Sequence, residues 1–209
     1  MLDKLLFKFK ERKLYHDVIE SLVAALEAKD IYTKGHSDRV ADMSYEISKK
    51  LGIKGVSLEQ IHIAAHLHDI GKIGVPDKVL NKKGRLNPHE LEYIKMHPRI
   101  GFDILSKSRT LKNISKIVLY HHERWDGKGY PEGISGLSIP IGSRIIAVSD
   151  AIDAMTSDRP YRKAMDLSSC LRELEVNKAL MFDPIIVECV LNRANIVNKF
   201  IQNKKINNF

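Results

Sequence analysis

Residues with the chemistry of metal ligands recur in five separate segments of this 209-residue chain, and a fold has to bring them together. These residues are His36, His68 with Asp69, His97, His121 with His122, and Asp150. A mixed set of imidazole and carboxylate donors suits divalent iron, manganese, nickel or zinc better than magnesium or calcium. Together they can supply enough ligands for two metal ions.

The segments that carry these residues read as successive helices joined by polar turns, so the predicted fold class is all-α. A first helix is expected to run to about Lys29 and to pack through the apolar face formed by Leu14, Val18, Leu22, Val23 and Leu26. A second helix is predicted to open at Ser37 and to end before Gly52.

Two further helix starts carry capping patterns. Ser57 and Gln60 have the spacing of a capping box, which would open a third helix that continues through Lys72. Asn87 is followed by a first-turn proline and by Glu90, the same kind of signal for a fourth helix. The His68-Asp69 pair would therefore lie within the third helix.

Residues 125–140 interrupt the helical pattern, because WDGKGYPEGISGLSIP holds four glycines and two prolines. Long irregular loops inside a compact domain are usually functional or mobile. This one closely follows His121 and His122, which at a helix C-terminus can both turn toward one pocket. We predict an ordered loop at this point.

One domain is expected over residues 14–202, with a basic segment at 1–13 before it and a frayed tail at 203–209 after it. The content of 44% hydrophobic and 29% charged residues is ordinary for one buried core. No apolar run of membrane-spanning length and no secretory signal is visible, so we expect a cytoplasmic protein. Cys170 and Cys189 are expected to be buried, reduced thiols.

The formal net charge of +8 favours anionic partners such as phosphate-rich ligands, nucleic acid or an acidic membrane surface. Part of this excess lies in the two ends of the chain. No helix shows a dense basic face with interleaved aromatic residues, so a nucleic-acid partner is not expected.

Four other histidines are assigned to structural positions. His62 and His66 have the spacing of a two-histidine zinc helix, but no glutamate follows His62 as a metalloprotease would require. On a continuous helix, His66 would also point roughly opposite to His68. We assign both to the surface or the edge of the core, and we treat His16 and His89 as structural too.

Residues next to the predicted ligands favour the binding of a phosphate group at the metal site. Gly71 allows a close backbone approach, and Lys72 adds a cation beside Asp69, which could itself bridge two ions. Asp150 lies on an apolar helix, where a carboxylate is costly unless it is paired or binds metal.

Residues just beyond Asp150 suggest supporting roles. Asp153, one turn later, would either orient a ligand or pair with an arginine. Arg159 and Arg162 suit bidentate phosphate contacts, and the alternative for them is a solvated run of charge.

At this point the chain resembles the HD-GYP family of the HD phosphohydrolase superfamily. HDIGK at 68–72 matches the HD element, and HHERWDGKGYP at 121–131 carries the GYP element. The likeness extends over roughly residues 19–191 through KDIYTKGHSDRV, KIGVPDKVL, SDRPYRKA and FDP. It implies an HD-type helical bundle whose Gly/Pro-rich loop is the GYP segment.

The resemblance also implies a function. The family holds a binuclear, often two-iron, centre at which a metal-activated hydroxide hydrolyses cyclic di-GMP to pGpG, with GMP as the product of a second cut. Asp69 and Lys72 would be the catalytic residues, and the substrate would contact Lys72, Tyr130, Arg159 and Arg162.

Carried over by position, the family's ligands divide into two sets that share Asp69. One metal would be held by His36, His68, Asp69 and Asp150, and the other by Asp69, His97, His121 and His122. A third metal in some members uses a glutamate where this chain has Tyr32, so two are expected here. His66 stands where the family usually has an apolar residue.

Other readings stay open beside this one. The domain could bind a cyclic dinucleotide as a catalytically silent effector, or hydrolyse another cyclic dinucleotide or a nucleotide monophosphate. Iron is expected, with manganese, nickel or zinc as alternatives. A regulatory protein partner is a further expectation, and the sequence does not fix the oligomeric state.

Overall fold

Helices fill the part of the chain that the computed structural model describes, which is residues 2–30, 34–158 and 163–207. No strand occurs within these ranges, and Lys178 and Phe182 form an isolated bridge. The α-helices are α1 (Leu2–Lys29), α2 (His36–Lys50), α3 (Gly55–His66), α4 (Asp77–Leu80), α5 (Pro88–Lys95), α6 (His97–Leu105), α7 (Lys112–Leu119), α8 (Ile141–Met155), α9 (Leu167–Val176), α10 (Pro184–Leu191) and α11 (Ala194–Asn207). Three short 3-10 helices are η1 (Ile70–Gly74), η2 (Arg109–Leu111) and η3 (Gly136–Ser138). The all-α prediction is confirmed.

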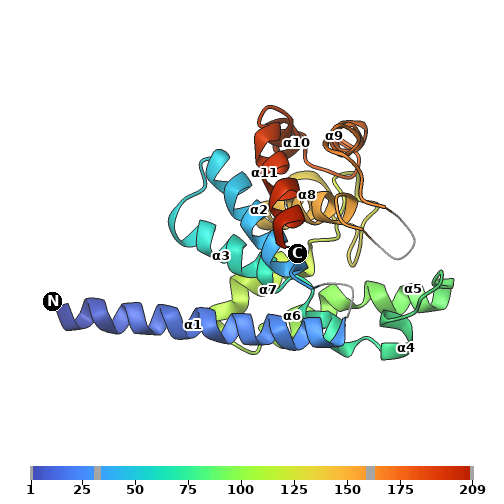
Figure 1. The fold of residues 1–209 in the computed structure, drawn as a ribbon. Coiled ribbons are helices and arrows are strands. Elements are labelled where there is room, and N and C mark those ends of the chain that lie inside the picture. Colours follow the sequence, from blue (N-terminus) through green and yellow to red (C-terminus); the bar gives the residue numbers. More distant parts are fainter. Residues whose placement is uncertain (1, 31–33, 159–162, 208–209) are drawn as a thin grey trace.

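The core forms around α2 and α8, which pack against each other in the middle of the bundle (Figure 1). Helix α2 also contacts α3, α10 and α11, while α8 contacts α3, α7, α9 and α10. Met43 and Ile47 of α2 and Ile145, Ile146 and Ile152 of α8 are fully buried. Each such side chain contributes about 1.5–3 kcal/mol on burial, so these two helices form a rigid support.

Helix α1 runs along one side of the molecule, and its N-terminal part extends beyond the other helices (Figure 1). The predicted apolar face is wrong in part. Val23 and Leu26 are buried, but Leu14, Val18 and Leu22 are 65%, 50% and 41% exposed. Ile19 completes the buried face instead, because the C-terminal part of α1 packs on η1 and α3 along a neighbouring line of side chains.

Two predicted helix boundaries also need correction. Helix α3 begins at Gly55 after Lys54 and has no side-chain cap, so Ser57 lies within its first turn and the expected capping box is absent. The same helix ends at His66 and does not continue through Lys72. Helix α2 begins at His36, one residue earlier than predicted.

The fourth predicted helix start is confirmed, since Asn87 and Glu90 form a reciprocal capping box at the start of α5. The loop over residues 125–140 is ordered, as predicted. Trp125 N–H donates to the carbonyl of Met181 at 3.1 Å, and Asp126 N–H donates to that of Leu180 at 2.9 Å. These bonds fix the start of the loop against the segment before α10.

The ends of the predicted domain do not coincide with helix ends. Helix α1 crosses residue 14 without a break, and α11 continues past residue 202 to Asn207, so the domain limits stay a prediction. Cys170 and Cys189 are buried free thiols, as expected. Among the described residues, no helix is long and apolar enough to span a membrane.

Candidate metal centre

The segment that joins α3 to η1 forms the floor of the centre. His68 and Asp69 lie in the turn after α3 and are 1% and 4% exposed. Gly71 lies two residues on, where an added Cβ would come within 1.9 Å of the carbonyl oxygen of His97. Glycine therefore allows η1 to pack against the start of α6, and this contact brings Asp69 to His97. The sequence predicted a close backbone approach at Gly71 but not that it would be with α6.

The first group of donors consists of His36, His68 and Asp69. His36 is the first residue of α2, and its Nε2 lies 3.8 Å from Asp69 Oδ2. His68 Nε2 lies 3.4 Å from the same oxygen. Asp150 reaches this group from α8, with Oδ1 at 3.4 Å from His36 Nε2.

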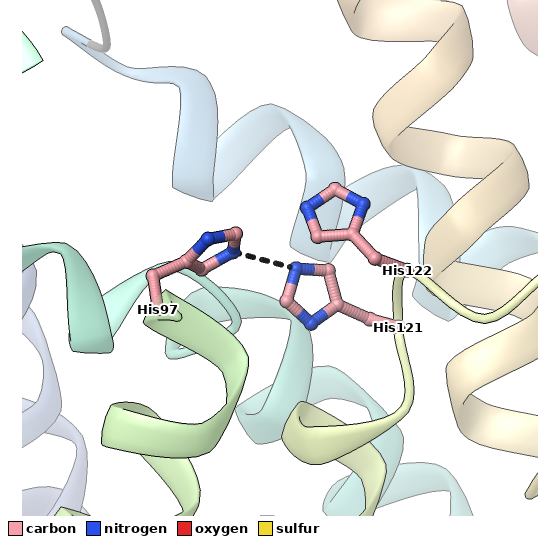
Figure 2. Close-up of side chains that lie close together, drawn as sticks. All are labelled: His97, His121 and His122. Atoms are coloured by element: carbon pink, nitrogen blue, oxygen red, sulfur yellow. Dashed lines mark hydrogen bonds between the residues drawn. The ribbon is translucent and has the colours of Figure 1, made fainter. Parts of the chain in front are cut away.

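The second group consists of His97, His121 and His122, whose rings converge in Figure 2. His97 opens α6, and the two adjacent histidines follow the end of α7. His97 Nε2 lies 3.2 Å from His121 Nε2 and 3.3 Å from Asp69 Oδ1. The two oxygens of Asp69 thus face different donor groups, an arrangement that suits a carboxylate shared by two cations.

Hydrogen bonds set the orientation of four of the imidazole rings. The Nδ1 atoms of His68, His97 and His121 lie 2.7, 2.7 and 2.6 Å from the carbonyl oxygens of the residues three positions earlier. Because a carbonyl can only accept, each Nδ1 carries the proton and each Nε2 presents a lone pair. His36 Nδ1 instead faces Asp153 Oδ2 at 2.7 Å, and this contact selects the same tautomer when the ring is neutral.

These lone pairs give a direct test of whether cations fit. The Nε2 atoms of His97 and His121 approach to 3.2 Å with no proton to share, and the Nε2 of His68 is buried without a hydrogen-bond partner. A buried polar atom without a partner is costly, and opposed lone pairs repel. Cations bound by imidazole and carboxylate would give the buried nitrogen a partner and remove the repulsion between the opposed lone pairs. The residues therefore fit two divalent metal ions.

The local electrostatics favour neutral imidazoles at His97 and His121, whereas at His36 the effect of burial is outweighed by the hydrogen bond to Asp153 and the nearby aspartates, which raise its pKa. Burial lowers the pKa of His97 to about 3, with the neighbouring His122 adding to the effect, and burial likewise holds the pKa of His121 well below its ordinary value. Burial opposes ionisation of Asp69, but the adjacent Lys72 ammonium outweighs it, so the pKa of Asp69 lies well below its usual range. Neutral imidazole and ionised carboxylate are the forms that bind metal.

Lys72 is held between two carboxylates. Its Nζ lies 2.8 Å from Asp69 Oδ2 and 3.1 Å from Asp30 Oδ2, and these two aspartates raise the pKa of Lys72 despite its burial. Asp30 is buried at the end of α1 and was not singled out from the sequence. One sequence feature indicated a role for Asp30, its place in the family-like segment KDIYTKGHSDRV. Its contact with Lys72 could not be predicted, because the two residues are 42 positions apart.

Tyr130 covers the second donor group from the glycine-rich loop. Its ring stacks on His122 with centroids 4.9 Å apart, and its N–H donates to the His122 carbonyl at 3.2 Å. A Cβ on Gly129 would come within 2.4 Å of Arg124 N, so the loop needs a glycine at this position. Tyr130 therefore lies against the second donor group, and its contact with a substrate stays a prediction.

The same loop is anchored by Glu123, which sequence reasoning missed. Its Oε1 accepts from the N–H groups of Glu132 and Gly133 at 2.7 and 3.0 Å. Glu123 directly follows the two histidines, and this position was the one available signal. The buried carboxylate ties the loop to the residues that precede it.

Asp153 contacts both kinds of partner considered for it, a predicted ligand and an arginine. It contacts His36 Nδ1, and its Oδ1 accepts from Arg39 Nε at 2.7 Å. Asp150 is less buried than its apolar helix suggested, since 23% of its side chain is exposed. Arg159, Arg162 and Tyr32 lie outside the described residues.

The remaining histidines stay apart from the two donor groups. His66 Nδ1 faces Asp38 Oδ1 at 3.2 Å, and His62 Nε2 lies 4.0 Å from Asp42 Oδ1. His89 is exposed and stacks on Tyr93. The assignment of His62 and His66 to positions outside the centre is confirmed, although α3 ends before the turn on which the prediction relied.

Comparison with known proteins agrees with this geometry. A family model described as "HD domain" matches residues 14–186. A solved structure of a cyclic GMP-AMP specific phosphodiesterase of Vibrio cholerae aligns with a TM-score of 0.61 and 18% identity, over 90% of this chain and 49% of that one. That likeness supports the fold.

Curated relatives are more similar in sequence. The cyclic di-GMP phosphodiesterase of Thermotoga maritima is 41% identical over 90% of this chain and 52% of its own length. The cyclic di-GMP phosphodiesterase response regulator RpfG of Xanthomonas campestris is 39% identical, over 84% and 47%. A 3'3'-cGAMP-specific phosphodiesterase of Vibrio cholerae is 38% identical, over 86% and 40%. The chain spans about half the length of these relatives or less.

Proposed function

Because the chain belongs to the HD domain family, we propose that it is a metal-dependent phosphodiesterase that hydrolyses cyclic di-GMP to pGpG. The names of two relatives support the substrate. The observation that carries the chemistry is Asp69, whose two oxygens face separate groups of histidines with unprotonated Nε2 atoms.

Two divalent metal ions would complete the site. His36, His68, Asp69 and Asp150 would hold one, and Asp69, His97, His121 and His122 the other. Iron is proposed first, with manganese, nickel or zinc as alternatives. Bound there, a pair of such cations makes a nucleophile from water near neutral pH and offsets the negative charge that develops on the phosphoryl oxygens.

The chain's own residues would position the phosphodiester. The Lys72 ammonium, held by Asp30 and Asp69, points a fixed positive charge at the edge of the centre and would contact a phosphate oxygen. Asp153 keeps His36 in the tautomer that presents Nε2. Tyr130 would line the pocket, and Arg159 and Arg162 are proposed as further phosphate contacts.

A second substrate has a specific observation in its favour, since one relative of nearly equal similarity is named for 3'3'-cGAMP. Both molecules are 3',3'-linked cyclic dinucleotides with the same pair of phosphodiesters, so the centre itself would not distinguish them. Discrimination would have to come from contacts to the bases. A catalytically silent effector is the remaining alternative, and a cytoplasmic location and a regulatory protein partner are proposed with the enzyme.

The test is to purify the chain without oxygen, measure bound metals, and incubate the same sample with cyclic di-GMP and, separately, with 3'3'-cGAMP. We expect about two metal ions per chain and formation of pGpG, followed by GMP if a second cut occurs. Asp69→Ala should lose both metal and hydrolysis, while the exposed His89→Gln variant should keep both.

Three outcomes would change the conclusion. An active, fully metallated Asp69→Ala variant would overturn the site. Faster cleavage of 3'3'-cGAMP would reassign the substrate within the same chemistry. Tight nucleotide binding without metal or turnover would favour the silent effector.

A further inference from the structure

Helix α2 begins without a cap from its own side chains, although its first residue is the metal donor His36. Gly35 occupies the N-cap position and has no side chain that could accept a hydrogen bond. The third residue of the helix, Asp38, is an acid at the position that completes a capping box, but its carboxylate faces His66 Nδ1 at 3.2 Å instead. The N–H of Gly35 therefore depends on an acceptor from another element.

Glu27, in the last turn of α1, supplies that acceptor. Its Oε1 accepts from the Gly35 N–H at 2.8 Å. Gly35 has a φ of 64°, a conformation that favours glycine, so the bond holds a turn that is already restricted to one residue type. A carboxylate at the N-terminal end of a helix is also favoured by the helix dipole. Glu27 thus takes the part that an acid of α2 itself plays in an ordinary capping box.

The end of α1 is a fixed support for this bond. Leu26, next to Glu27, is buried in the core. Lys29 Nζ donates to the carbonyl of Ile73 at 2.6 Å, and Asn81 Nδ2 donates to the carbonyl of Lys29 at 3.0 Å. These contacts attach the last turn of α1 to η1 and to the end of α4, so Glu27 projects from a segment that cannot move freely.

The position of His36 depends on its backbone as well as on its ring. Asp153 orients the ring through Nδ1, but that bond does not determine where α2 begins. His36 Nε2 lies 3.4 Å from Asp150 Oδ1 and 3.8 Å from Asp69 Oδ2. Donor atoms of a site must be held within about 0.5 Å of their working geometry. Glu27 bonds to the residue immediately before His36 and so restrains the backbone from which this donor projects.

We propose that Glu27 is a positioning residue of the metal centre, which holds the start of α2 so that His36 reaches the cation that it shares with Asp69. This role rests on the two-metal centre proposed above. It gives α1 a part in metal binding, although α1 carries none of the proposed donors. The second donor group comes from α6 and from the residues after α7, so the effect of Glu27 should fall on one of the two ions.

The zinc affinity of the full chain tests the proposal. Metal-free protein is titrated with zinc in competition with a chromophoric chelator, for the native chain and for two variants. Glu27→Ala removes the acceptor, and we expect one of the two zinc ions to bind about tenfold more weakly, as when other residues that support a metal ligand are lost. Glu27→Gln keeps a side-chain carbonyl that can accept from Gly35, so it should retain most of the native affinity.

Glu20→Ala is the matched control, because Glu20 is an exposed glutamate on the same helix. It should bind both zinc ions as the native chain does. Amide hydrogen exchange of the metal-free proteins gives a second readout. The Gly35 amide should exchange faster in Glu27→Ala than in the native chain and the other two variants, because it has lost its acceptor. Circular dichroism verifies that each variant is folded.

Three results would overturn the proposal. Glu27→Ala could bind both zinc ions with native affinity, or it could weaken both ions equally, which would assign Glu27 to the stability of the whole fold. An equal loss in Glu27→Ala and Glu27→Gln would show that the hydrogen bond to Gly35 is not the cause. Zinc binding is measured without a nucleotide, so a lack of cyclic dinucleotide hydrolysis would contradict the proposed function and leave this comparison intact.

Discussion

The centre around Asp69 and the His/Asp pairs between α2 and α3 are built from the same residue types but differ in how their side chains are held. In the centre, His68, His97 and His121 are 1% exposed, and a carbonyl fixes each ring. In the α2–α3 pairs, the aspartates are mostly exposed, and His66 and His62 face the carboxylates of Asp38 and Asp42. Burial and fixed ring orientations distinguish a set of donors that is already arranged for metal binding from half-exposed ion pairs between two helices.

The largest effect is expected where the centre depends on close backbone packing. Gly71→Ala would place a Cβ 1.9 Å from the His97 carbonyl oxygen and 2.5 Å from Gly101 N, so η1 must move away from α6. We expect the free energy of unfolding to fall by about 3 kcal/mol and the metal content to fall with it. Denaturant unfolding and metal analysis measure both.

Gly84→Ala is the matched control, because a Cβ there would meet nothing within 4 Å. Its stability should stay within about 0.5 kcal/mol of the native protein. If Gly71→Ala behaved like Gly84→Ala, the close contact between η1 and α6 would not be needed for the centre.

The next effect concerns the fixed tautomers. Asp153→Asn removes the carboxylate that orients His36, which would make His36 resemble the less constrained histidines of α3. Loss of such a partner weakens metal binding by about 10- to 100-fold, and competition with a chromophoric chelator measures this.

Arg39→Gln separates this role from simple stabilisation of the fold. It breaks the Arg39–Asp153 ion pair of 2.7 Å but leaves the His36–Asp153 contact in place. Metal affinity should therefore change much less than in Asp153→Asn. An equal loss in the two variants would contradict the orienting role.

Asp30→Asn tests whether Asp30 positions Lys72, the proposed contact to the substrate phosphate. The variant removes one of the two carboxylates around Lys72, and a charge-assisted hydrogen bond is worth about 1.5–3 kcal/mol. We expect the KM for the cyclic dinucleotide to rise about tenfold, with a smaller change in kcat and with metal content kept. Asp30→Glu should restore part of the loss.

Asp77→Asn serves as the comparison for Asp30→Asn, because Asp77 forms a surface ion pair with Lys29 at the same end of α1 and is 77% exposed. Its kinetics should match those of the native enzyme. A tenfold rise in KM there too would assign the effect to the position of α1 as a whole.

The smallest effect lies in the α2–α3 pairs and depends on pH. The pKa of His62 is about 4 in the folded protein and 6.5 for an ordinary histidine, so unfolded chains gain a proton between these pH values that folded chains do not. The stability that neutral His62 provides is complete above pH 6.5 and is lost as the pH falls toward 4. His66, His16, Asp38, Asp42 and Tyr45 are the titratable groups around it.

His62→Gln should remove this part of the pH dependence. Between pH 7 and pH 4, the native chain should lose about 1–2 kcal/mol more stability than the variant, after allowance for solvent screening. Urea unfolding in the presence of a chelator measures the difference. Parallel pH profiles would show that His62 has an ordinary pKa.

Sequence reasoning located the candidate donors better than the boundaries of the neighbouring helices. The seven predicted donors and Lys72 lie together, because their residue types can be read along the chain. The end of α3 at His66 was missed, because apolar spacing continues past it and the turn is fixed by the contact with His97.

Contacts between distant segments explain the other differences. The buried line on α1 was misassigned because η1 and α3 decide which of two adjacent apolar lines is covered. Asp30 and Glu123 were missed because the sequence does not show which lysine or which loop amides an acid will meet.

The bonds from Asp153 to His36 and Arg39 join residues 117 and 114 positions apart. Contacts of such long sequence separation form late, since the intervening chain must first be brought together. During synthesis, a chain that ends before α8 lacks both Asp150 and the partner that orients His36. Metal loading at the complete centre must therefore follow translation of most of the domain.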